Sequence, residues 1–253
     1  MSRRIMAPSQ LLYNVERHLH PCGDFYICND FNENVFRPPV IKIEDKIYYR
    51  FLNFLYLPQP PESLSNDKII EVCDLRLEHL NKLVNHEYNS RIAAAIADHV
   101  TSIFPKINSN AWKVKALDFG CGSGLSSQLI LQHFPQLDIV GVDISKKAVQ
   151  HSTEQGLTAF LTLPDEPLPF EAASFDLVFA VFVMHFKIDM VTLAELRRVL
   201  RSSGKFVFNL YQRDIDGVGE QLLEAGFSIV EVVKDFCETG TDHKIVSCSL
   251  LPS

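Results

Sequence analysis

A glycine-rich turn between a strand-like run and a helical pattern constrains this chain more than any other feature. Residues 114–119 form a short, mostly apolar run of the kind that a buried strand shows, and it ends at the first of three alternating glycines, Gly120, Gly122 and Gly124. A helical pattern of apolar residues follows over 125–134. Because glycine lacks a Cβ and adopts positive φ without strain, this order of elements lets the backbone approach a nucleotide closely.

Two acidic residues accompany this turn. Asp118 lies two residues before the first glycine, and Asp143 ends the next apolar run, about 20 residues downstream, where a carboxylate can accept both ribose hydroxyls. This spacing fits two cofactor classes. A dinucleotide fold usually has the pattern G-x-G-x-x-G with a pyrophosphate at the helix N-terminus. Here the pattern is G-x-G-x-G, and the Asp118 carboxylate would repel a pyrophosphate and attract an ammonium or sulfonium cation. The acid therefore argues against NAD.

The composition limits the function classes. A chain of 253 residues with 47% hydrophobic and 22% charged residues can hold one α/β domain with an extension. The net charge of −7, with no compensating Lys/Arg block, argues against a nucleic-acid partner. The basic start is followed by no apolar signal region, and the longest apolar run, near 177–184, is too short for a bilayer. We therefore expect a cytoplasmic protein without a membrane partner, monomeric or homodimeric, with its six scattered cysteines reduced.

The first third of the chain differs from the rest, and we expect an N-terminal α+β extension over 1–66 and the main domain over 67–253. A weakly helical pattern covers 1–22, a β-hairpin or small sheet is expected within 23–58, and 58–67 is a proline-rich linker. A group of possible metal ligands lies near the end of that first pattern. No second pair of ligands follows it at the spacing of a zinc finger, so we expect the end of a surface helix there and no metal site. This group consists of His18, His20, Cys22 and Cys28.

From Lys113 onward strands and helices alternate, which indicates a mostly parallel sheet covered on both faces. Helices are also expected from Asp67 and over about 88–104. Only a short loop (236–242) separates the last two strands, and such a loop joins antiparallel neighbours. The expected strands lie near 114–119, 138–142, 158–162, 175–182, 204–210, 227–233 and 243–250, and the expected helices near 124–133, 146–154, 189–201 and 215–225.

About residues 85–250 resemble the class I S-adenosylmethionine (SAM)-dependent methyltransferases. The resemblance implies a Rossmann-like, doubly wound, mostly parallel seven-stranded sheet with an antiparallel strand near the C-terminus, and SAM as the cofactor. The matching segments, in the order of the family, are VKALDFGCGSG (114–124), GVDIS (141–145), LPF (168–170), SFDLVFAVFVMHF (174–186), LAELRRVLRSSGKFVFNL (193–210) and LLEAGFSIVEV (222–232).

The resemblance also implies a set of cofactor-binding residues. Asp118 and the three glycines would line the methionine part of SAM, with Cys121 filling space in the loop. Asp143 would bind the ribose, Ile144 would pack on the adenine, and the backbone of Phe182 would pass under the cofactor. Tyr88 is a candidate contact for the cofactor carboxylate.

Two positions depart from the family pattern. The usual Gly-Asp-Ala before LPF is replaced by Leu163-Pro164-Asp165, which shifts Asp165, the candidate adenine ligand, by one residue and removes a backbone donor. The loop RVLRPGG reads RVLRSSG, in which Gly204 can still form the turn.

The catalytic candidates follow the fourth and fifth strands of the main sheet. His185 lies at a strand end, where open α/β sheets bind ligands, and is the best candidate for a general base; the alternative is a histidine that holds the loop. Tyr211 is a candidate for orienting the acceptor, and a loop tyrosine with a satisfied hydroxyl is the alternative. We expect methyl transfer from SAM to an oxygen or nitrogen atom of a small organic acceptor, an apolar or aromatic metabolite, with residues 1–66 as a lid. The alternatives are a SAM-fold protein with another reaction, such as a cyclisation, a non-catalytic scaffold and, distantly, an NAD-dependent enzyme.

Overall fold

The computed structural model describes residues 15–28, 37–51, 55–79, 86–104, 107, 113–211, 213–234 and 243–252. The chain forms two compact units, Met1–Leu64 and Ser65–Ser253. Among the helices in the described part of the chain, none combines the length and apolarity needed to cross a bilayer.

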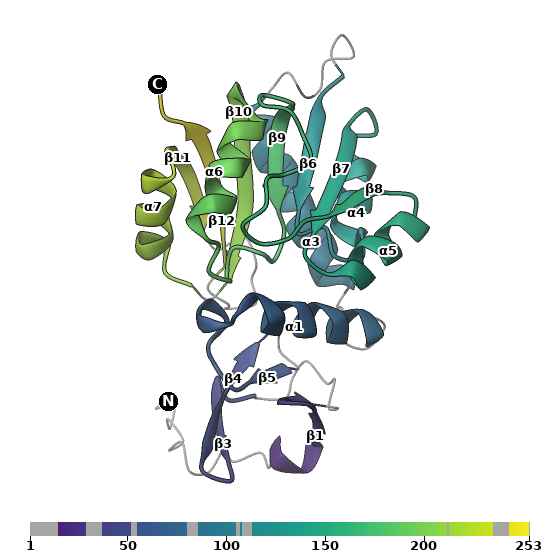
Figure 1. The fold of residues 1–253 in the computed structure, drawn as a ribbon, viewed down its shortest axis with the longest axis vertical. Helices are drawn as coiled ribbons and strands as arrows, with labels where there is room; N and C mark the ends of the chain where they lie inside the picture. Colours follow the sequence, from purple (N-terminus) through teal and green to yellow (C-terminus); the bar gives the residue numbers. More distant parts are fainter. Residues whose placement is uncertain are drawn as a thin grey trace, which may run out of the picture. The chain divides into compact units, whose positions relative to one another are not determined.

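The first unit contains a five-stranded antiparallel sheet with the order β1-β2-β5-β4-β3 (Figure 1). The small sheet expected from the aromatic and β-branched residues is therefore present. Glu44 and Asp45 form the two-residue turn between β3 and β4, and both have positive φ (47° and 67°), as a tight hairpin turn requires. The strands are β1 (Leu19–Cys22), β2 (Phe25–Cys28), β3 (Val40–Ile43), β4 (Lys46–Phe51) and β5 (Leu55–Leu57).

The structure differs from the expected N-terminal helix. In the described part of this segment, Val15–His18 forms a 3-10 turn (η2), and Leu19–Cys22 is a strand paired with Phe25–Cys28. The surface helix end expected around His20 and Cys22 is therefore wrong. The helical pattern was weak, and pairing across the Gly23 turn, with φ of 59°, outweighed it. The proline-rich linker likewise contains a short 3-10 helix, η3 (Pro61–Ser63), and residues 1–14 lie outside the described part.

The second unit is built on a seven-stranded sheet with the order β11-β12-β10-β9-β6-β7-β8. The ladders between β8, β7, β6, β9 and β10 are all parallel, and β12 pairs antiparallel with both β10 and β11. This confirms the α/β fold with an antiparallel C-terminal strand. The strands are β6 (Lys115–Phe119), β7 (Asp138–Asp143), β8 (Thr158–Leu161), β9 (Phe175–Ala180), β10 (Leu200–Tyr211), β11 (Phe227–Lys234) and β12 (His243–Leu250).

Helices cover this sheet, and side-chain caps define several of their starts. Ser65, Ser145 and Asp189 accept hydrogen bonds from the backbone of the first turns of α1, α5 and α6. In Figure 1, α6 lies in front of the sheet and α3 behind it. The helices are α1 (Asn66–Glu78), α3 (His86–Ile103), α4 (Leu125–His133), α5 (Lys146–Glu154), α6 (Met190–Val199) and α7 (Ile215–Glu224).

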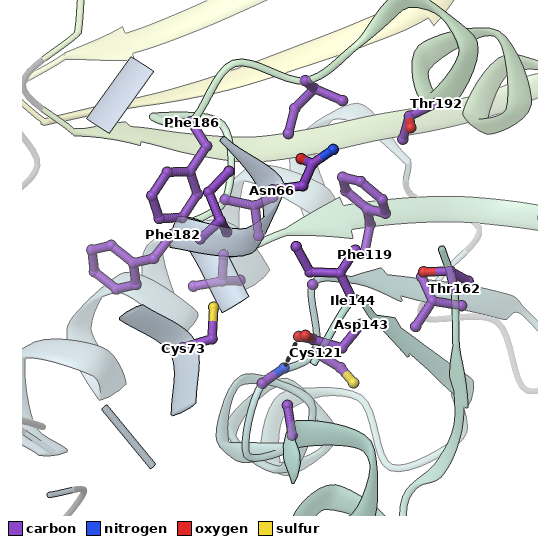
Figure 2. A pocket seen from close by; sticks show the side chains of 18 of the residues that line it. Asn66, Cys73, Phe119, Cys121, Asp143, Ile144, Thr162, Phe182, Phe186 and Thr192 are labelled. Carbon is purple, nitrogen blue, oxygen red and sulfur yellow. Dashed lines mark hydrogen bonds between the residues drawn. The ribbon is translucent and has the colours of Figure 1, made fainter. Parts of the chain in front are cut away.

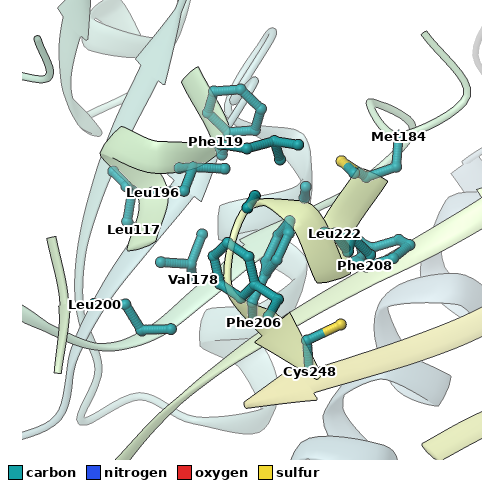
Figure 3. Close-up of a cluster of buried hydrophobic side chains, with 14 of the residues drawn as sticks. Leu117, Phe119, Val178, Met184, Leu196, Leu200, Phe206, Phe208, Leu222 and Cys248 are labelled. Carbon is teal, nitrogen blue, oxygen red and sulfur yellow. The ribbon is translucent and has the colours of Figure 1, made fainter. Parts of the chain in front are cut away.

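The main hydrophobic core lies between the central strands and the helices α6 and α7. Leu117, Val178 and Phe206 from three neighbouring strands are fully buried there, together with Leu196 of α6 and Leu222 of α7 (Figure 3). Because the strands are parallel and covered by helices, their sequences are nearly continuous apolar runs. This packing fixes the carboxyl ends of the strands, where the candidate site is found.

Candidate functional site

A cavity lies at the carboxyl ends of β6, β7 and β9, and five segments of the second unit form most of its walls (Figure 2). These are the glycine turn after β6, the end of β7, the chain between Thr162 and Leu168, the chain between Val181 and Asp189, and the inward face of α1. Open α/β sheets bind ligands at this edge. Most of the lining is apolar, and a few charged side chains stand among the apolar ones.

The glycine turn has the backbone geometry that its sequence requires. Gly120, Gly122 and Gly124 have φ values of 75°, 52° and 80°, which L-residues with side chains rarely adopt. A Cβ on Gly120 would meet Val183 Cγ2 at 2.4 Å, whereas the Cβ position of Gly122 has no described atom within 4 Å. The turn is held because the N–H groups of Gly120 and Cys121 donate to Val142 O. A ligand can therefore approach the backbone at Gly122.

Asp143, the last residue of β7, lies in the cavity wall beside this turn. Its Oδ2 accepts from Gly122 N at 2.9 Å, shown by the dashed line in Figure 2, and its Oδ1 accepts from Ser145 N at 2.8 Å. Burial raises the pKa of the carboxyl, and the two backbone donors oppose that rise. Each carboxylate oxygen has a second lone pair. The side chain is therefore oriented by the backbone and still able to accept from a ligand.

Asp118 lies behind the turn and is not among the described residues that line the cavity. Its side chain is fully buried, Ser127 Oγ donates to its Oδ2 at 2.6 Å, and its Oδ1 has no hydrogen-bond partner in the described part of the chain. Burial raises the pKa of this carboxyl to about 7. Asp118 can therefore act on a ligand through its field and through the turn.

Phe182 lies in the cavity wall with a positive φ of 59°, an unusual conformation for a bulky residue. Its N–H donates to Asn209 Oδ1 at 2.6 Å, and Asn209 Nδ2 lies 2.7 Å from His243 Nε2. A backbone N–H can only donate, so it fixes the orientation of the amide, and His243 Nε2 must then accept from Nδ2. Sequence reasoning missed both Asn209 and His243, which lie 34 residues apart on β10 and β12.

The two catalytic candidates do not line the cavity. His185 is 2% exposed, and its ring is tilted against that of Phe186, with centroids 4.4 Å apart, while Val183 and Phe186 line the cavity. Burial, and then the charge of Arg76, lower the pKa of His185 well below its ordinary value. Tyr211 is 5% exposed, and its ring centroid is 5.3 Å from that of His243. The structure therefore places both side chains behind the wall formed by the loop after β9.

The wall on the far side of Asp143 contains Ile144 and the chain from Thr162 to Leu168. Asp165 is exposed and does not belong to the described lining, whereas Pro164 and Glu166 do. The one-residue shift seen in the sequence thus turns the Asp165 side chain away from the cavity. Its φ of 64° accompanies this turn.

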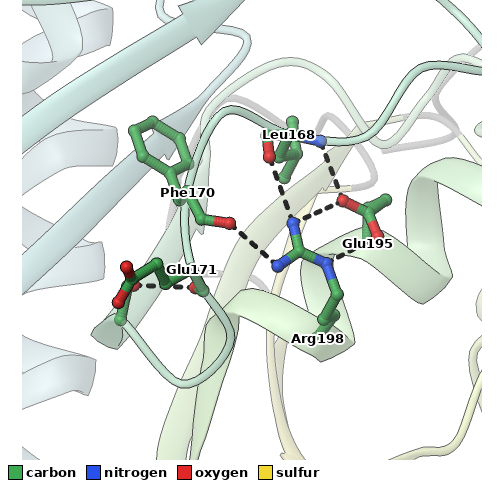
Figure 4. A network of polar contacts seen from close by, with 6 residues as sticks. Leu168, Phe170, Glu171, Glu195 and Arg198 are labelled. Atoms are coloured by element: carbon green, nitrogen blue, oxygen red, sulfur yellow. Dashed lines mark hydrogen bonds and ion pairs between the residues drawn. The ribbon is translucent and has the colours of Figure 1, made fainter.

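An arginine network anchors this wall to α6 (Figure 4). Arg198 binds both oxygens of Glu195, each at 2.7 Å, and donates to the carbonyl oxygens of Leu168 and Phe170. Leu168 N in turn donates to Glu195 Oε2 at 2.8 Å. The motif LPF and the helix LAELRRVL are therefore joined by one planar ion pair, which sets the position of the wall.

The other predicted site residues differ in whether their side chains line the cavity. Cys121 is buried, lines the cavity and lies 3.9 Å from Ser152 Oγ, and burial raises the pKa of its thiol. Tyr88 lies in the first turn of α3, and its side chain is outside the described part of the chain. Sequence reasoning did not assign α1 to the site, yet Ile69, Cys73 and Arg76 of this helix line the cavity. Their helical spacing predicts that they share one face of the helix, but it does not predict which part of the protein that face contacts.

The second unit is an α/β domain with a cavity at the carboxyl ends of its parallel strands, and comparison with known proteins shows what it is similar to. Residues 117–208 match the family described as "Methyltransferase domain". The chain is 32% identical over 114 residues to the malonyl-[acyl-carrier protein] O-methyltransferase of Herminiimonas arsenicoxydans, covering 45% of this chain and 42% of that protein. It is 28% identical over 174 residues to the protein named arginine-hydroxylase NDUFAF5, mitochondrial, of Mus musculus, covering 61% of this chain and 46% of that one.

A solved structure shows the same fold. The TehB-like SAM-dependent methyltransferase of Corynebacterium glutamicum superposes with a TM-score of 0.53 and 15% identity, covering 73% of this chain and all of that one. The chain spans less than half the length of the two curated relatives above. Residues 117–208 therefore match a methyltransferase domain, and the fold is that of a SAM-dependent methyltransferase, in agreement with the predicted resemblance and with SAM as the cofactor.

Proposed function

We propose that this protein transfers the methyl group of SAM to a small organic acceptor. One observation carries the proposal: the glycine turn and the backbone-oriented Asp143 share one cavity with apolar walls, inside a methyltransferase domain. Bound SAM supplies an electrophilic methyl group on a positively charged sulfur, so the protein has to hold the acceptor in line and exclude water.

The residues of the cavity suit each part of SAM. The two Asp143 oxygens, held by Gly122 and Ser145, suit a pair of ribose hydroxyls. Ile144 and Leu163 offer apolar surface for the adenine. The open space above Gly122 lets the ligand lie against the backbone. In this assignment Phe182 contributes its backbone beside the methyl group, and Asp118 contributes negative charge from behind the turn.

The acceptor is proposed to be a metabolite-sized molecule. The acid-rich chain and the cavity enclosed by α1 both suit such a ligand better than a polyanion. The unit Met1–Leu64 has no counterpart in the matched family segment and is proposed as the substrate lid. The relative from Herminiimonas arsenicoxydans is named for transfer to an oxygen atom of an acyl group, which supports an O-methylation.

A second candidate is a reaction other than methyl transfer on the same domain. The mouse relative, which matches the largest share of this chain among those described above, is named a hydroxylase. A domain of this fold with intact binding residues therefore need not transfer a methyl group, and the chemistry has to be measured.

The test uses the full chain with SAM carrying a labelled methyl group and a fractionated metabolite extract. Methyl transfer predicts label in a small organic product together with one equivalent of S-adenosylhomocysteine. SAM binding by calorimetry without label transfer to any fraction would contradict the proposal and favour the second candidate. Parallel calorimetry with NADH is expected to show no binding.

A further inference from the structure

The cavity contains a cation, Arg76, that acts on Asp143 only through its charge. Arg76 lies on the inward face of α1 and lines the cavity, and it makes no hydrogen bond or ion pair with any residue that the structure describes. It stands seven residues after Ile69 and three after Cys73, on a mostly apolar helix face that begins with Asn66. A partly buried guanidinium costs free energy unless an anion compensates it.

Arg76 is held in this position by the neighbouring face of α1. Asp74 Oδ1 accepts from Ser145 Oγ at 2.6 Å, and Lys147 Nζ lies 3.3 Å from Asp74 Oδ2 and 2.9 Å from Glu78 Oε1. These contacts fix the C-terminal half of the helix beside the residues that follow Asp143. The direction of Arg76 into the cavity is therefore set by packing.

The charge of Arg76 acts on two parts of the site. It is among the causes that hold down the pKa of Asp143 against burial, and it is the second cause, after burial, that lowers the pKa of His185. Asp143 marks the ribose end of the proposed cofactor position, and His185 belongs to the loop that ends β9. The guanidinium of Arg76 is therefore within electrostatic range of Asp143 and of His185, between which the transferred methyl group would lie.

Most of the acidic side chains that line the cavity already accept hydrogen bonds or form ion pairs within the protein. Asp143 accepts from two backbone N–H groups, Asp189 accepts from Thr192 N and Oγ1, and Glu195 pairs with Arg198. Glu166 is exposed. None of the described lining residues is a histidine, the side chain that most often acts as a general base. This wall suits an acceptor that needs no deprotonation.

We propose that Arg76 binds a carboxylate of the methyl acceptor, so that the substrate class is a carboxylic acid that is ionised at neutral pH. This inference rests on the proposed function. A carboxylate placed between Arg76 and the sulfonium reduces the repulsion between two cations in one cavity. A carboxylate oxygen donates a lone pair to the methyl carbon while the carbon–sulfur bond breaks and its electron pair stays on sulfur. The products are a methyl ester and a neutral thioether, and no proton is released.

The first measurement is calorimetric titration of malonate into the full chain saturated with S-adenosylhomocysteine. The parental protein is expected to bind malonate and not its neutral diamide. Arg76→Gln is expected to weaken malonate binding at least tenfold, Arg76→Lys less, because lysine keeps the charge and loses the planar fork. Arg91→Gln is the matched control, because Arg91 is an exposed helix arginine paired with Glu87 on α3, and it should leave malonate binding unchanged. A parental protein that does not bind malonate would overturn the proposal.

The second measurement identifies the source of the carboxylate, because SAM carries one of its own. The affinities of SAM and decarboxylated SAM are compared in the parental protein and in Arg76→Gln. Both affinities should stay within about threefold if the acceptor carries the carboxylate. A loss for SAM alone would assign Arg76 to the cofactor, and an equal loss for both would mean that Arg76 acts through Asp143. Either result overturns the acceptor assignment.

The third measurement concerns the product. Methyl esters release labelled methanol in alkali, whereas methyl ethers and methylamines do not. Alkali-labile label that depends on Arg76 supports the inference, and alkali-stable label overturns it. No transfer at all, together with Arg76-dependent malonate binding, would overturn the methyl-transfer function and leave the carboxylate site standing.

Discussion

The backbone N–H of Phe182 donates a 2.6 Å hydrogen bond to Oδ1 of Asn209, and this bond ties the cavity wall to the middle of the sheet. Phe182 has a positive φ, and Asn209 is fully buried and lies 2.7 Å from His243 through its amide nitrogen. A conformation of this kind persists only where the surroundings hold it. The bond therefore couples the shape of the site to a side chain that never touches the cavity.

Asn209→Leu should destabilise the fold by about 1–3 kcal/mol, because the Phe182 N–H and His243 Nε2 lose their partner in a buried position. The affinity for S-adenosylhomocysteine should fall as well. Denaturant unfolding and calorimetry measure the two effects. Asn209→Asp is the control because it keeps the acceptor for Phe182. Equal losses of affinity in both variants would show that this hydrogen bond does not shape the site.

Asp143→Ala should weaken SAM binding by about 1.5–3 kcal/mol through the loss of charge-assisted hydrogen bonds. The unliganded protein should also melt at a lower temperature, because the N–H groups of Gly122 and Ser145 lose their acceptor. Asp143→Asn keeps one acceptor oxygen and should lose less stability. Unchanged SAM affinity in the alanine variant would refute the ribose assignment.

Asp118 should make the stability of the fold depend on pH. Its pKa is raised to about 7 in the folded protein, so the folded state holds a proton that the unfolded state has already released above pH 4. Stability from this group is present at low pH and falls as pH rises towards 7. Asp118→Asn should therefore gain stability relative to the parent between pH 5 and pH 8, by on the order of 1–4 kcal/mol. Urea unfolding at the two pH values tests this, and a pH-independent difference would contradict it.

His185 should contribute to packing and give no acidic limb near pH 6.5 in the rate profile. Its folded pKa is well below the ordinary value, so it stays neutral at neutral pH. Its contribution to stability is lost as pH falls below the unfolded value of about 6.5, because the unfolded state gains a proton first. His185→Ala should lower the melting temperature, mainly through lost contact with Phe186. A fall in turnover of about 10²–10⁴-fold with an unchanged melting temperature would instead restore it as the general base.

Deleting residues 1–64 should leave a folded core that binds SAM and transfers no methyl group. The second unit, Ser65–Ser253, contains the complete seven-stranded sheet and every described residue that lines the cavity. Calorimetry with SAM and the label-transfer assay measure the two properties separately. A truncated protein with parental turnover would show that the first unit is not a lid.

The sequence by itself determined the elements of the second unit and the turn at its centre. Gly120, Gly122 and Gly124 have positive φ values, and such positions can be predicted from residue type because local sterics favour glycine there. The alternation of strands and helices similarly implied the parallel sheet, because a parallel connection needs a crossover and an antiparallel one does not. The position of Asp143 could also be predicted from the sequence, because this residue ends a strand at a fixed spacing from the turn.

Only the tertiary structure decided which side chains enter the cavity. In strands buried on both faces the apolar pattern does not distinguish the faces, so Asn209 and His243 carried no signal of their pairing across β10 and β12. The positive φ at Phe182 redirects the loop after β9, which turns Val183 inward and His185 away. Arg76 reaches the site because Asp74 and Glu78 bind the start of α5, 69–71 residues along the chain. Such long-range contacts depend on the folded arrangement of whole elements, which local residue preferences do not specify.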